Sequence, residues 1–296
     1  MYPSSELVLN KNGQVYHLGL SPENLAEKVI LVGDQDRVAL ISTYFDSIEH
    51  QSHHREFICH TGMYQGKRIS VLSTGIGTDN IDIVVNELDA LVNIDLEKRI
   101  DLPTKTALTL VRIGTCGILQ PEIPVHAYIL STHAFGLDNI AHFYDVSFTD
   151  EELKINDSLM NHLSLPPKIQ PYTISADENL VNALRSELTH EGITVTSSGF
   201  YAPQGRKLRL PLATQNLNEN LTDFRFGRLS GRSENASELK VTNFEMESSA
   251  LFVLGKNLGH ACATICLGVA NRPNQQFSKG YESEMKELVQ YVLDRI

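Results

Sequence analysis

Short apolar runs alternate with segments of helical spacing, and this alternation restricts the fold more than any other feature of the chain. An apolar run at 28–34 precedes a helical pattern at 36–45, and another helical pattern covers 79–93. Later strands are expected at 107–114, 126–132, 193–199 and 261–269, and later helices within 241–259 and at 178–188 and 283–296. Continuous apolar strands separated by helices are typical of a parallel sheet covered on both faces. We therefore predict a single α/β domain over residues 1–296, with a mixed, mostly parallel central sheet flanked by helices.

Two segments depart from this alternation. Gln65 and Gly66 separate two consecutive strand-like runs, which predicts a β-hairpin. Residues 205–242 are polar and have no strong apolar period, so we interpret them as a flap or an excursion from the domain.

The composition excludes several classes of protein. The 296 residues carry a formal net charge of −11, which argues against a nucleic acid or an anionic membrane surface as the main partner. No apolar window is long enough to span a bilayer, and the opening residues MYPSSELVLN do not resemble a signal peptide. The four cysteines form no CxxC pair, and Cys262 and Cys266 lie in an apolar strand, so buried thiols are expected instead of metal ligands. These features indicate a soluble protein of a reducing compartment, the cytoplasm, with no metal site.

A glycine turn after the first predicted strand suits an anion. Arg37 follows Gly33 at the first turn of a helix, where free N–H groups and the helix dipole favour a negative ligand. The alternative is that Asp34 caps the helix and Arg37 is solvated. A second glycine turn, at 75–77, lacks the third glycine of the dinucleotide fingerprint, so a Rossmann dehydrogenase is disfavoured.

Arg112 lies inside a strand that is otherwise suited to burial. A buried guanidinium needs an anionic partner, which is either a carboxylate of the protein or a bound anion. The next turn, which contains Thr115 and two glycines, offers backbone donors and a hydroxyl beside it. Arg55 stands with His53 and His54 at the start of another predicted strand; these histidines have no partner at metal-ligand spacing and are interpreted as surface or interface residues. Together the arginines and glycines suit a small, doubly charged anion such as phosphate.

Two carboxylates, Glu245 and Glu247, flank Met246 at the head of an apolar stretch that runs to residue 259. Acids at a helix start are favoured by the helix dipole alone. The residues by themselves leave open whether these acids also bind a ligand.

The segments singled out above follow the order and approximate spacing of the nucleoside phosphorylase family. The chain resembles that family nearly end to end, and within it the uridine phosphorylases most closely. The segments that carry the resemblance are VYHLGL, GDQDRV, SHHREF, STGIG, VRIGTCG, GFYAPQGR and NFEMESSAL.

The resemblance implies a binding site for phosphate and ribose. The phosphate site would contain Gly33, Arg37, Arg112 and Thr115, completed by Arg55 from a neighbouring subunit. Met246 would lie against the ribose, and Glu247, with Glu245 beside it, would bind the 2′- and 3′-hydroxyls through charge-assisted hydrogen bonds. His17 would reach the 5′-hydroxyl of a nucleoside bound to the partner subunit.

The resemblance also implies a pyrimidine base. Gln204 and Arg206 match the pair that reads the uracil edge, and Phe200 would pack against the ring. A glutamine amide both donates and accepts, and an arginine donates to a carbonyl oxygen. Purine-specific relatives carry an aspartate after the late strand, where this chain has Val269, Ala270 and Asn271.

The implied reaction is the reversible phosphorolysis of uridine to uracil and ribose 1-phosphate, with Arg37, Arg112 and Arg206 as the catalytic residues. No cofactor is implied beyond the co-substrate phosphate, and a monovalent cation at the subunit interface is left open. The expected assembly is a homodimer or a trimer of dimers. Rival interpretations are a purine nucleoside phosphorylase, a nucleosidase of the same fold that uses water, and a non-catalytic nucleoside sensor. The chain departs from the family's pattern at Val32, at Gln35 and in a long loop at 95–107.

Overall fold

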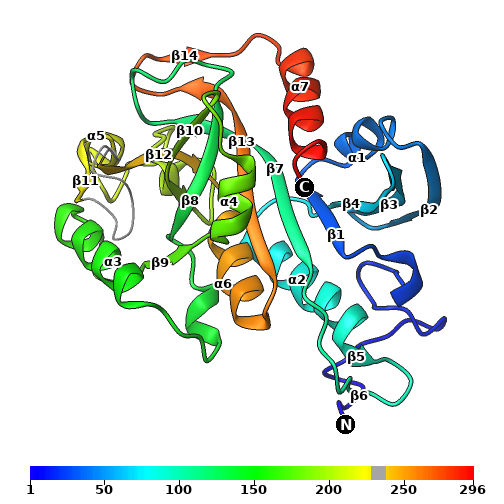
Figure 1. The fold of residues 1–296 in the computed structure, drawn as a ribbon. Coiled ribbons are helices and arrows are strands. Elements are labelled where there is room, and N and C mark those ends of the chain that lie inside the picture. The colour runs from blue at the N-terminus through cyan, green and yellow to red at the C-terminus, as the bar shows by residue number, and fades with distance from the viewer. Residues whose placement is uncertain (228–237) are drawn as a thin grey trace.

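The structure is a computed structural model, described here for residues 1–227 and 238–296. In this part of the chain a twelve-stranded sheet has the order β11-β12-β10-β8-β13-β7-β1-β4-β3-β2, with β14 beside β13 and β9 beside β8 (Figure 1). Its strands are β1 (Lys28–Val32), β2 (Ser47–His54), β3 (Phe57–Tyr64), β4 (Lys67–Ser73), β7 (Thr109–Ile118), β8 (Tyr128–Gly136), β9 (Tyr172–Ser175), β10 (Thr189–Thr196), β11 (Arg225–Phe226), β12 (Leu239–Glu245), β13 (Ala261–Asn271) and β14 (Gln276–Phe277). The helices are α1 (Gln35–Ser42), α2 (Thr78–Asn93), α3 (Asp150–His162), α4 (Glu178–Leu184), α5 (Leu217–Asp223), α6 (Ser248–Leu258) and α7 (Glu282–Leu293), with short 3₁₀ turns at Pro22–Asn24, Ile140–Phe143 and Ala202–Gln204.

Most of the central pairings are parallel. Strand β1 pairs in parallel with β4 and β7, β7 with β13, and β10 with β8 and β12. The pairings β2–β3, β3–β4, β8–β9, β8–β13 and β13–β14 are antiparallel. The predicted α/β fold with a mixed central sheet is therefore confirmed.

The sheet also curls back on itself. Strand β12 makes a second, antiparallel pairing with β7, in which Asn243 and Phe244 lie opposite Ile118 and Gly117. Strands β7, β13, β8, β10 and β12 thus form a closed ring of pairings. Because of this pairing, the chain after Phe244 lies beside the second half of β7.

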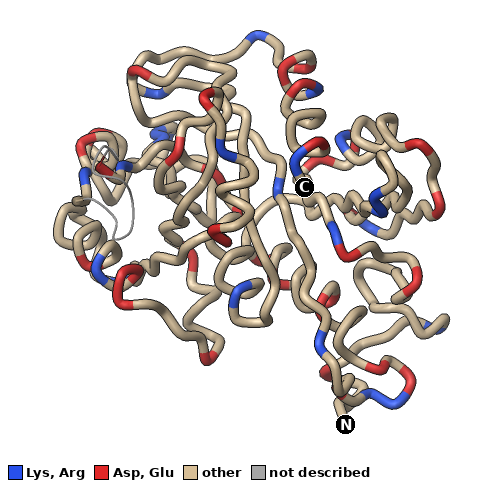
Figure 2. Tube along the Cα trace, in the orientation of Figure 1, with Lys and Arg blue, Asp and Glu red and all other residues tan. Residues whose placement is uncertain are grey.

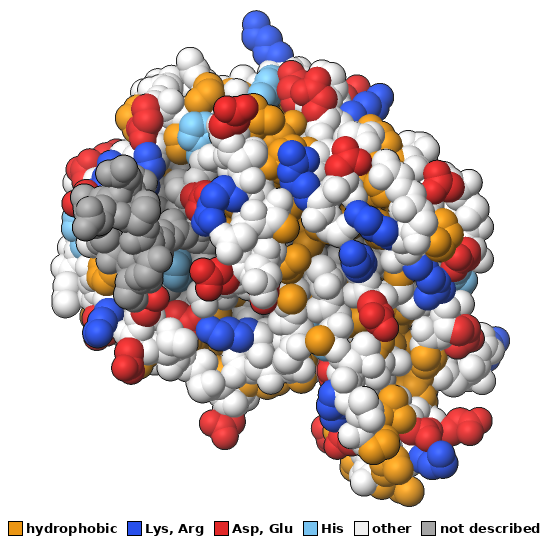
Figure 3. Space-filling view, in the orientation of Figure 1, with side chains coloured by type: hydrophobic (Ala, Val, Ile, Leu, Met, Phe, Trp, Pro, Cys, Tyr) orange, Lys and Arg blue, Asp and Glu red, His pale blue; other side chains and the backbone are white. Residues whose placement is uncertain are grey.

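Helices cover the sheet on both faces (Figure 1). Apolar residues of α2 and α6 pack with the buried N-terminal residues Leu7, Val15, Leu18 and Leu20 in one core. Residues of α1, α4 and α7 build the core on the opposite face, and α5 and the apolar side of α3 pack on β10 and β12. Charged residues lie mainly on helices and loops, and the visible face mixes acidic and basic side chains (Figures 2 and 3).

Most predicted elements lie where the sequence places them, with some corrections. The hairpin between β3 and β4 is confirmed, and both Gln65 (φ 48°) and Gly66 (φ 77°) have the positive φ that a tight two-residue hairpin turn requires. The expected helix at 178–188 ends at Leu184, because Arg185 is extended and its guanidinium pairs with Glu191 at the start of β10. Arg55 lies in the turn between β2 and β3, not at the start of a strand, because the polar strand β2 precedes it.

The interpretation of 205–242 as one excursion needs correction at its described ends. Residues 239–242 already belong to β12 of the central sheet. Leu217, Leu221 and Phe224 are buried against β10 and β12, so α5 is part of the packed structure. Residues 228–237 of this segment lie outside the described part of the chain.

The long loop at 95–107 contains a small hairpin of β5 (Ile94–Asp95) and β6 (Ile100–Asp101) that holds the N-terminal segment. The backbone N–H of Tyr2 donates to the Arg99 carbonyl at 2.7 Å, and Arg99 Nε donates to the Tyr2 carbonyl at 3.1 Å. The Arg99 guanidinium also donates to the carbonyl of Leu7. The loop therefore contributes to anchoring the segment that leads to His17.

Within residues 1–227 and 238–296, no helix combines the length and the apolar character needed to cross a membrane. All four cysteines are buried free thiols. Burial raises the pKa of Cys59 to about 12.

Candidate active site

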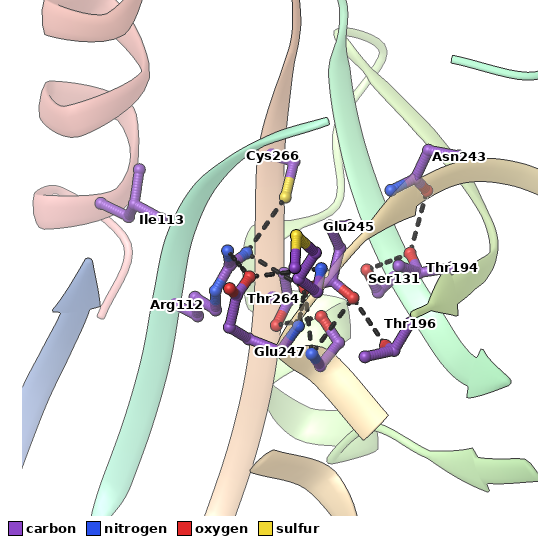
Figure 4. Close-up of polar contacts among 12 residues, drawn as sticks. Arg112, Ile113, Ser131, Thr194, Thr196, Asn243, Glu245, Glu247, Thr264 and Cys266 are labelled. Carbon is purple, nitrogen blue, oxygen red and sulfur yellow. Dashed lines mark hydrogen bonds and ion pairs between the residues drawn. The ribbon is translucent and has the colours of Figure 1, made fainter. Parts of the chain in front are cut away.

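The site is built where β7, β12 and β13 meet (Figure 4). Arg112 lies in the middle of β7 and is 4% exposed. Its Nη1 donates to Cys266 Sγ of β13 at 3.5 Å, and a side chain at Gly114 would collide with the guanidinium. The expectation that Arg112 is buried inside a strand is confirmed.

Two carboxylates surround this arginine. The Arg112 guanidinium forms an ion pair with Glu247, and Arg112 Nη1 lies 3.4 Å from Glu245 Oε2. Burial alone would lower the pKa of Arg112, but the two acids outweigh it and raise that pKa above its usual value. Of the two partners that the sequence left open, the protein carboxylate is therefore present. Arg112 Nε is buried and has no hydrogen-bond partner among the described residues, so the guanidinium keeps a free donor.

Glu245 and Glu247 make different contacts although they are two residues apart. Glu245 accepts hydrogen bonds from the Thr196 hydroxyl at 2.6 Å, from the backbone N–H of Glu247 at 2.9 Å and from that of Ser248. It therefore caps the first turn of α6. Burial raises the pKa of Glu245 above its usual value and Glu247 adds to the rise, although Arg112 opposes it. The hydrogen bonds of Glu245 give it a structural role as the cap of α6. The ribose contact predicted for Glu245 stays a prediction.

Glu247, which is 4% exposed, joins three segments of the site. Its Oε1 accepts from the backbone N–H of Gly77 at 2.8 Å, in the turn between β4 and α2. Its Oε2 accepts from Arg112 and, at 3.3 Å, from the backbone N–H of Met246. Met246 itself is half-buried. The carboxylate is thus fixed beside the second glycine turn that the sequence singled out.

Arg37 and the first glycine turn lie next to β7. Arg37 Nη1 donates to the Ile113 carbonyl at 3.3 Å. Burial lowers the pKa of Arg37, and the positive charge of Arg112 contributes to the lowering. Asp34 accepts from the backbone N–H of Asp36 at 3.0 Å, so it caps α1 as the alternative interpretation proposed, while Arg37 is not simply solvated. Gly33 directly follows β1, and Arg37 reaches β7 beside Arg112. The half-buried Thr115 lies within β7, which continues to Ile118 in its pairing with β13, so the turn expected around Thr115 is a strand.

A second cluster forms around Gln204, which is 3% exposed. Its Oε1 accepts from Arg206 Nη1 at 2.5 Å and from the guanidinium of Arg272. The Arg206 guanidinium stacks on the ring of Phe200, with Cζ 3.8 Å from the ring centroid, and Phe200 is half-exposed. The three residues predicted to read the base are therefore in contact with one another.

Arg272 is the residue of this cluster that sequence reasoning missed. It follows β13, stacks on Phe244 of β12 at 4.7 Å and donates to the backbone and side chain of Gln204. Burial lowers the pKa of Arg272 to about 9, and the charge of Arg206 adds to the effect. Its Nε is buried without a partner among the described residues. The sequence signal for Arg272 was its position at the carboxyl end of an apolar strand. It was missed because this stretch was considered only for its lack of an aspartate.

Arg55 and His17 lie apart from these clusters. Arg55 is exposed and donates to the Tyr16 hydroxyl at 3.2 Å, and the His17 ring contacts Glu87. No hydrogen bond or ion pair among the described residues links either of them to Arg112. Within one chain, Gln35 Nε2 at the start of α1 donates to the Arg55 carbonyl at 3.1 Å, so the backbone of Arg55 lies near the first glycine turn while its guanidinium contacts Tyr16.

Comparison with known proteins identifies relatives of this arrangement. Residues 27–295 match the family model described as the phosphorylase superfamily. The chain is 29% identical over 286 residues to a uridine phosphorylase of Thermococcus kodakarensis, covering 96% of this chain and 87% of that protein. A crystal structure of a Trypanosoma brucei nucleoside phosphorylase, described as showing uridine phosphorylase activity, superimposes with a TM-score of 0.90 at 30% identity and covers 98% of this chain and 99% of that one. A uridine phosphorylase of the oomycete Phytophthora capsici shares the fold, with a TM-score of 0.72 at 21% identity over 99% of this chain and 97% of that one.

Proposed function

The chain belongs to the phosphorylase superfamily, and we propose that its site works as that of a uridine phosphorylase, a pentosyltransferase that uses phosphate to cleave the N-glycosidic bond of uridine. The substrates are a nucleoside and inorganic phosphate. The full-length matches to uridine phosphorylases support this choice within the superfamily. The strongest support is the environment of the buried Arg112. Its guanidinium keeps a free donor near Arg37 and also forms an ion pair with Glu247, a carboxylate suited to sugar hydroxyls.

The proposed phosphate site consists of Gly33, Arg37, Arg112 and Thr115. A doubly charged anion gains most where two guanidinium groups and backbone donors converge, because such hydrogen bonds are charge-assisted. A nucleosidase, which activates water, has little use for a buried and a half-buried arginine at this point. Burial lowers the pKa of Arg37 and the charge of Arg112 adds to the lowering, so an anion bound beside both guanidinium groups would favour the charged form of Arg37.

Ribose is proposed to lie against Met246, with its 2′- and 3′-hydroxyls donating to Glu247. The Gly77 N–H and Arg112 hold that carboxylate in place before the sugar arrives. Pre-arranged acceptors of this kind reduce the entropic cost of orienting the ring. Glu245 supports the arrangement as the cap of α6.

Phosphate then attacks C1′ while the bond between C1′ and the base nitrogen breaks, and the electron pair of that bond leaves with uracil. The sugar becomes cationic in the transition state and the base becomes anionic. Phosphate oxygens held by Arg37 and Arg112 stabilise the cation, and Arg206 stabilises the negative charge on the uracil oxygen. Catalysis is thus assigned to positioning and electrostatics, with no side-chain nucleophile and no cofactor beyond the co-substrate phosphate.

The proposed base site is the cluster of Phe200, Gln204 and Arg206, and Arg272 belongs to it by its contacts with Gln204. Gln204 can turn its amide to pair with adjacent donor and acceptor atoms of a pyrimidine. The free Nε of Arg272 supplies a further donor near this cluster. A purine would present a different pattern of donors and acceptors to the same amide.

We also propose that the sites are shared between subunits of a homodimer, or of a trimer of dimers, with Arg55 and His17 entering the partner's site. Arg55 is exposed and His17 is partly exposed, and neither is hydrogen-bonded to Arg112 or Glu247 among the described residues, so both side chains are available to a partner subunit. A monovalent cation at that interface is left as a proposal. The four free cysteines support a reducing compartment, proposed to be the cytoplasm.

The function is tested with purified enzyme on uridine, 2′-deoxyuridine, thymidine, inosine and adenosine, with and without phosphate. We expect uridine cleavage that requires phosphate or arsenate and yields ribose 1-phosphate. Equal release of uracil without phosphate would indicate a nucleosidase. Inosine cleaved as fast as uridine would refute the assignment of the base cluster.

A further inference from the structure

The carboxylate of Glu87, on α2, is enclosed by the N-terminal segment. Its Oε1 lies 2.7 Å from His17 Nδ1 and accepts from the backbone N–H of His17 at 3.0 Å. Its Oε2 accepts from the backbone N–H of His17 at 3.1 Å and from that of Leu18 at 2.8 Å. The Glu87 side chain is 15% exposed and that of His17 is 31% exposed. One acid therefore fixes both the backbone and the ring of His17.

Other contacts hold His17 from the opposite side. His54, next to Arg55 in the chain, places Nδ1 2.8 Å from the His17 carbonyl, to which it donates. The Tyr16 ring packs edge-on against the His17 ring at 5.0 Å. Among the described residues, nothing hydrogen-bonds to His17 Nε2. The ring thus has one nitrogen bound to an acid and one without a hydrogen-bond partner among the described residues.

The acid determines what the free nitrogen can do. A carboxylate only accepts hydrogen bonds, so the proton of a neutral His17 ring must reside on Nδ1. Nε2 then carries a lone pair and accepts a hydrogen bond from a donor such as a hydroxyl. With the proton on Nε2 instead, the ring would donate there and Nδ1 would face the carboxylate without a proton, lone pair against lone pair.

We propose that Glu87 is a positioning residue that fixes the tautomer of His17, so that Nε2 accepts a hydrogen bond from the 5′-hydroxyl of the nucleoside. This inference rests on the proposed function, in which His17 meets that hydroxyl in the partner's site. Acids that hydrogen-bond to metal-binding histidines have the same effect, because the hydrogen bond to one ring nitrogen decides the role of the other. A purely structural role for Glu87, joining the N-terminal segment to α2, predicts different results in the experiment below.

The first measurement is the tautomer itself, by ¹⁵N nuclear magnetic resonance of histidine-labelled enzyme. The His17 resonances are assigned by their loss in His17→Ala. We expect the Nδ1–H tautomer in the native protein and a mixture of tautomers in Glu87→Gln, because an amide can either donate to or accept from Nδ1. A native ring with the proton on Nε2 would overturn the proposal without the need for any variant.

The second measurement compares uridine with 5′-deoxyuridine, which lacks the hydroxyl in question. Glu87→Gln should lower kcat/KM for uridine by about 3- to 10-fold, the range of one neutral hydrogen bond, and leave kcat/KM for 5′-deoxyuridine unchanged. Glu178→Gln removes the same charge from an exposed position at the start of α4 and should leave kcat/KM for both substrates unchanged. In a His17→Ala background, Glu87→Gln should have no further effect on the ratio of kcat/KM for uridine to kcat/KM for 5′-deoxyuridine.

Equal losses on both substrates, or a further loss in the His17→Ala background, would assign Glu87 a structural role only. These outcomes are distinct from failure of the proposed function, which would appear as native enzyme that does not cleave uridine in the presence of phosphate.

Discussion

Replacing Arg112 with methionine tests the electrostatic balance at the centre of the site. Methionine keeps a flexible chain of similar length but removes the charge between Glu245 and Glu247. Both acids are 4% exposed, so the variant buries two carboxylates without their shared counter-ion. The perturbation isolates that charge, since the hydrogen bonds of the acids to Thr196 and to the backbone of Gly77 and Ser248 remain.

Removal of one partner from a buried ion pair costs about 3–5 kcal/mol of unfolding free energy. We expect a loss in this range at neutral pH, a large fraction of the total of roughly 5–15 kcal/mol that folded proteins have. The loss should depend on pH. Burial already raises the pKa of Glu245, and Arg112 opposes the rise, so the pKa of the acid rises further in the variant.

The sign of the pH dependence follows from proton binding. In the folded Arg112→Met variant, Glu245 holds a proton that the unfolded chain releases near the ordinary glutamate pKa of 4.5. Its stability must therefore fall as pH rises above that value. The difference from the native sequence should be smallest near pH 5 and should widen towards pH 8.

The assay is urea unfolding at fixed protein concentration across this pH range. Far-ultraviolet circular dichroism is the suitable signal because the chain contains no tryptophan. Arg112→Met combined with Glu245→Gln should recover a substantial part of the loss, since one of the uncompensated charges is gone. The exposed-arginine control Arg209→Met should stay within about 0.5 kcal/mol of the native protein. A loss below about 1 kcal/mol for Arg112→Met, equal at all pH values, would refute the reasoning.

Three further predictions concern activity. Glu247→Ala removes a charged acceptor worth about 1.5–3 kcal/mol, so kcat/KM should fall more for uridine than for 2′-deoxyuridine; equal losses would point to a structural glutamate. Arg272→Met leaves Gln204 with one donor fewer and should lower kcat/KM for uridine by about 5- to 100-fold. The control is again Arg209→Met, and an unchanged kcat/KM in Arg272→Met would show that Arg272 is not part of the base site. Arg55→Ala and Arg112→Ala should each be nearly inactive alone, and mixing them after dissociation should restore activity towards one working site per heterodimer. If heterodimers form and no activity returns, Arg55 does not act across the interface.

The elements that could be predicted are those with a strong local period. Strand β13 is a continuous apolar run, and α2 repeats its apolar residues at helical spacing, so both appear in the sequence as they do in the structure. Strand β2 was missed because it lies at the edge of the sheet, where its residues are mostly exposed and polar and show no alternation. Helix α3 was missed because only a narrow part of it is buried, although Thr149 and Glu152 form a capping box that could have marked its start.

The candidate site divides in the same way. Arg112 could be singled out because a charge inside an apolar strand is anomalous in the sequence itself, and so could the acids at the head of α6. Arg272 could not be connected with Gln204, because the two residues are 68 positions apart and meet only through the packing of the chain after β13. The contact between Glu87 and His17 spans 70 positions and likewise has no local signal.

The sequence by itself determined the alternation of strands and helices and the residue types that suit phosphate, sugar and base, because periodicity and anomalous charges are local properties. Tertiary structure alone decided which strand ends meet. The second pairing of β12 with β7 closes the sheet and places Glu245 and Glu247 against Arg112. Its physical basis is the curvature of a twisted sheet, which brings the ends of β7 and β12 into hydrogen-bonding distance although about 125 residues separate them in the chain.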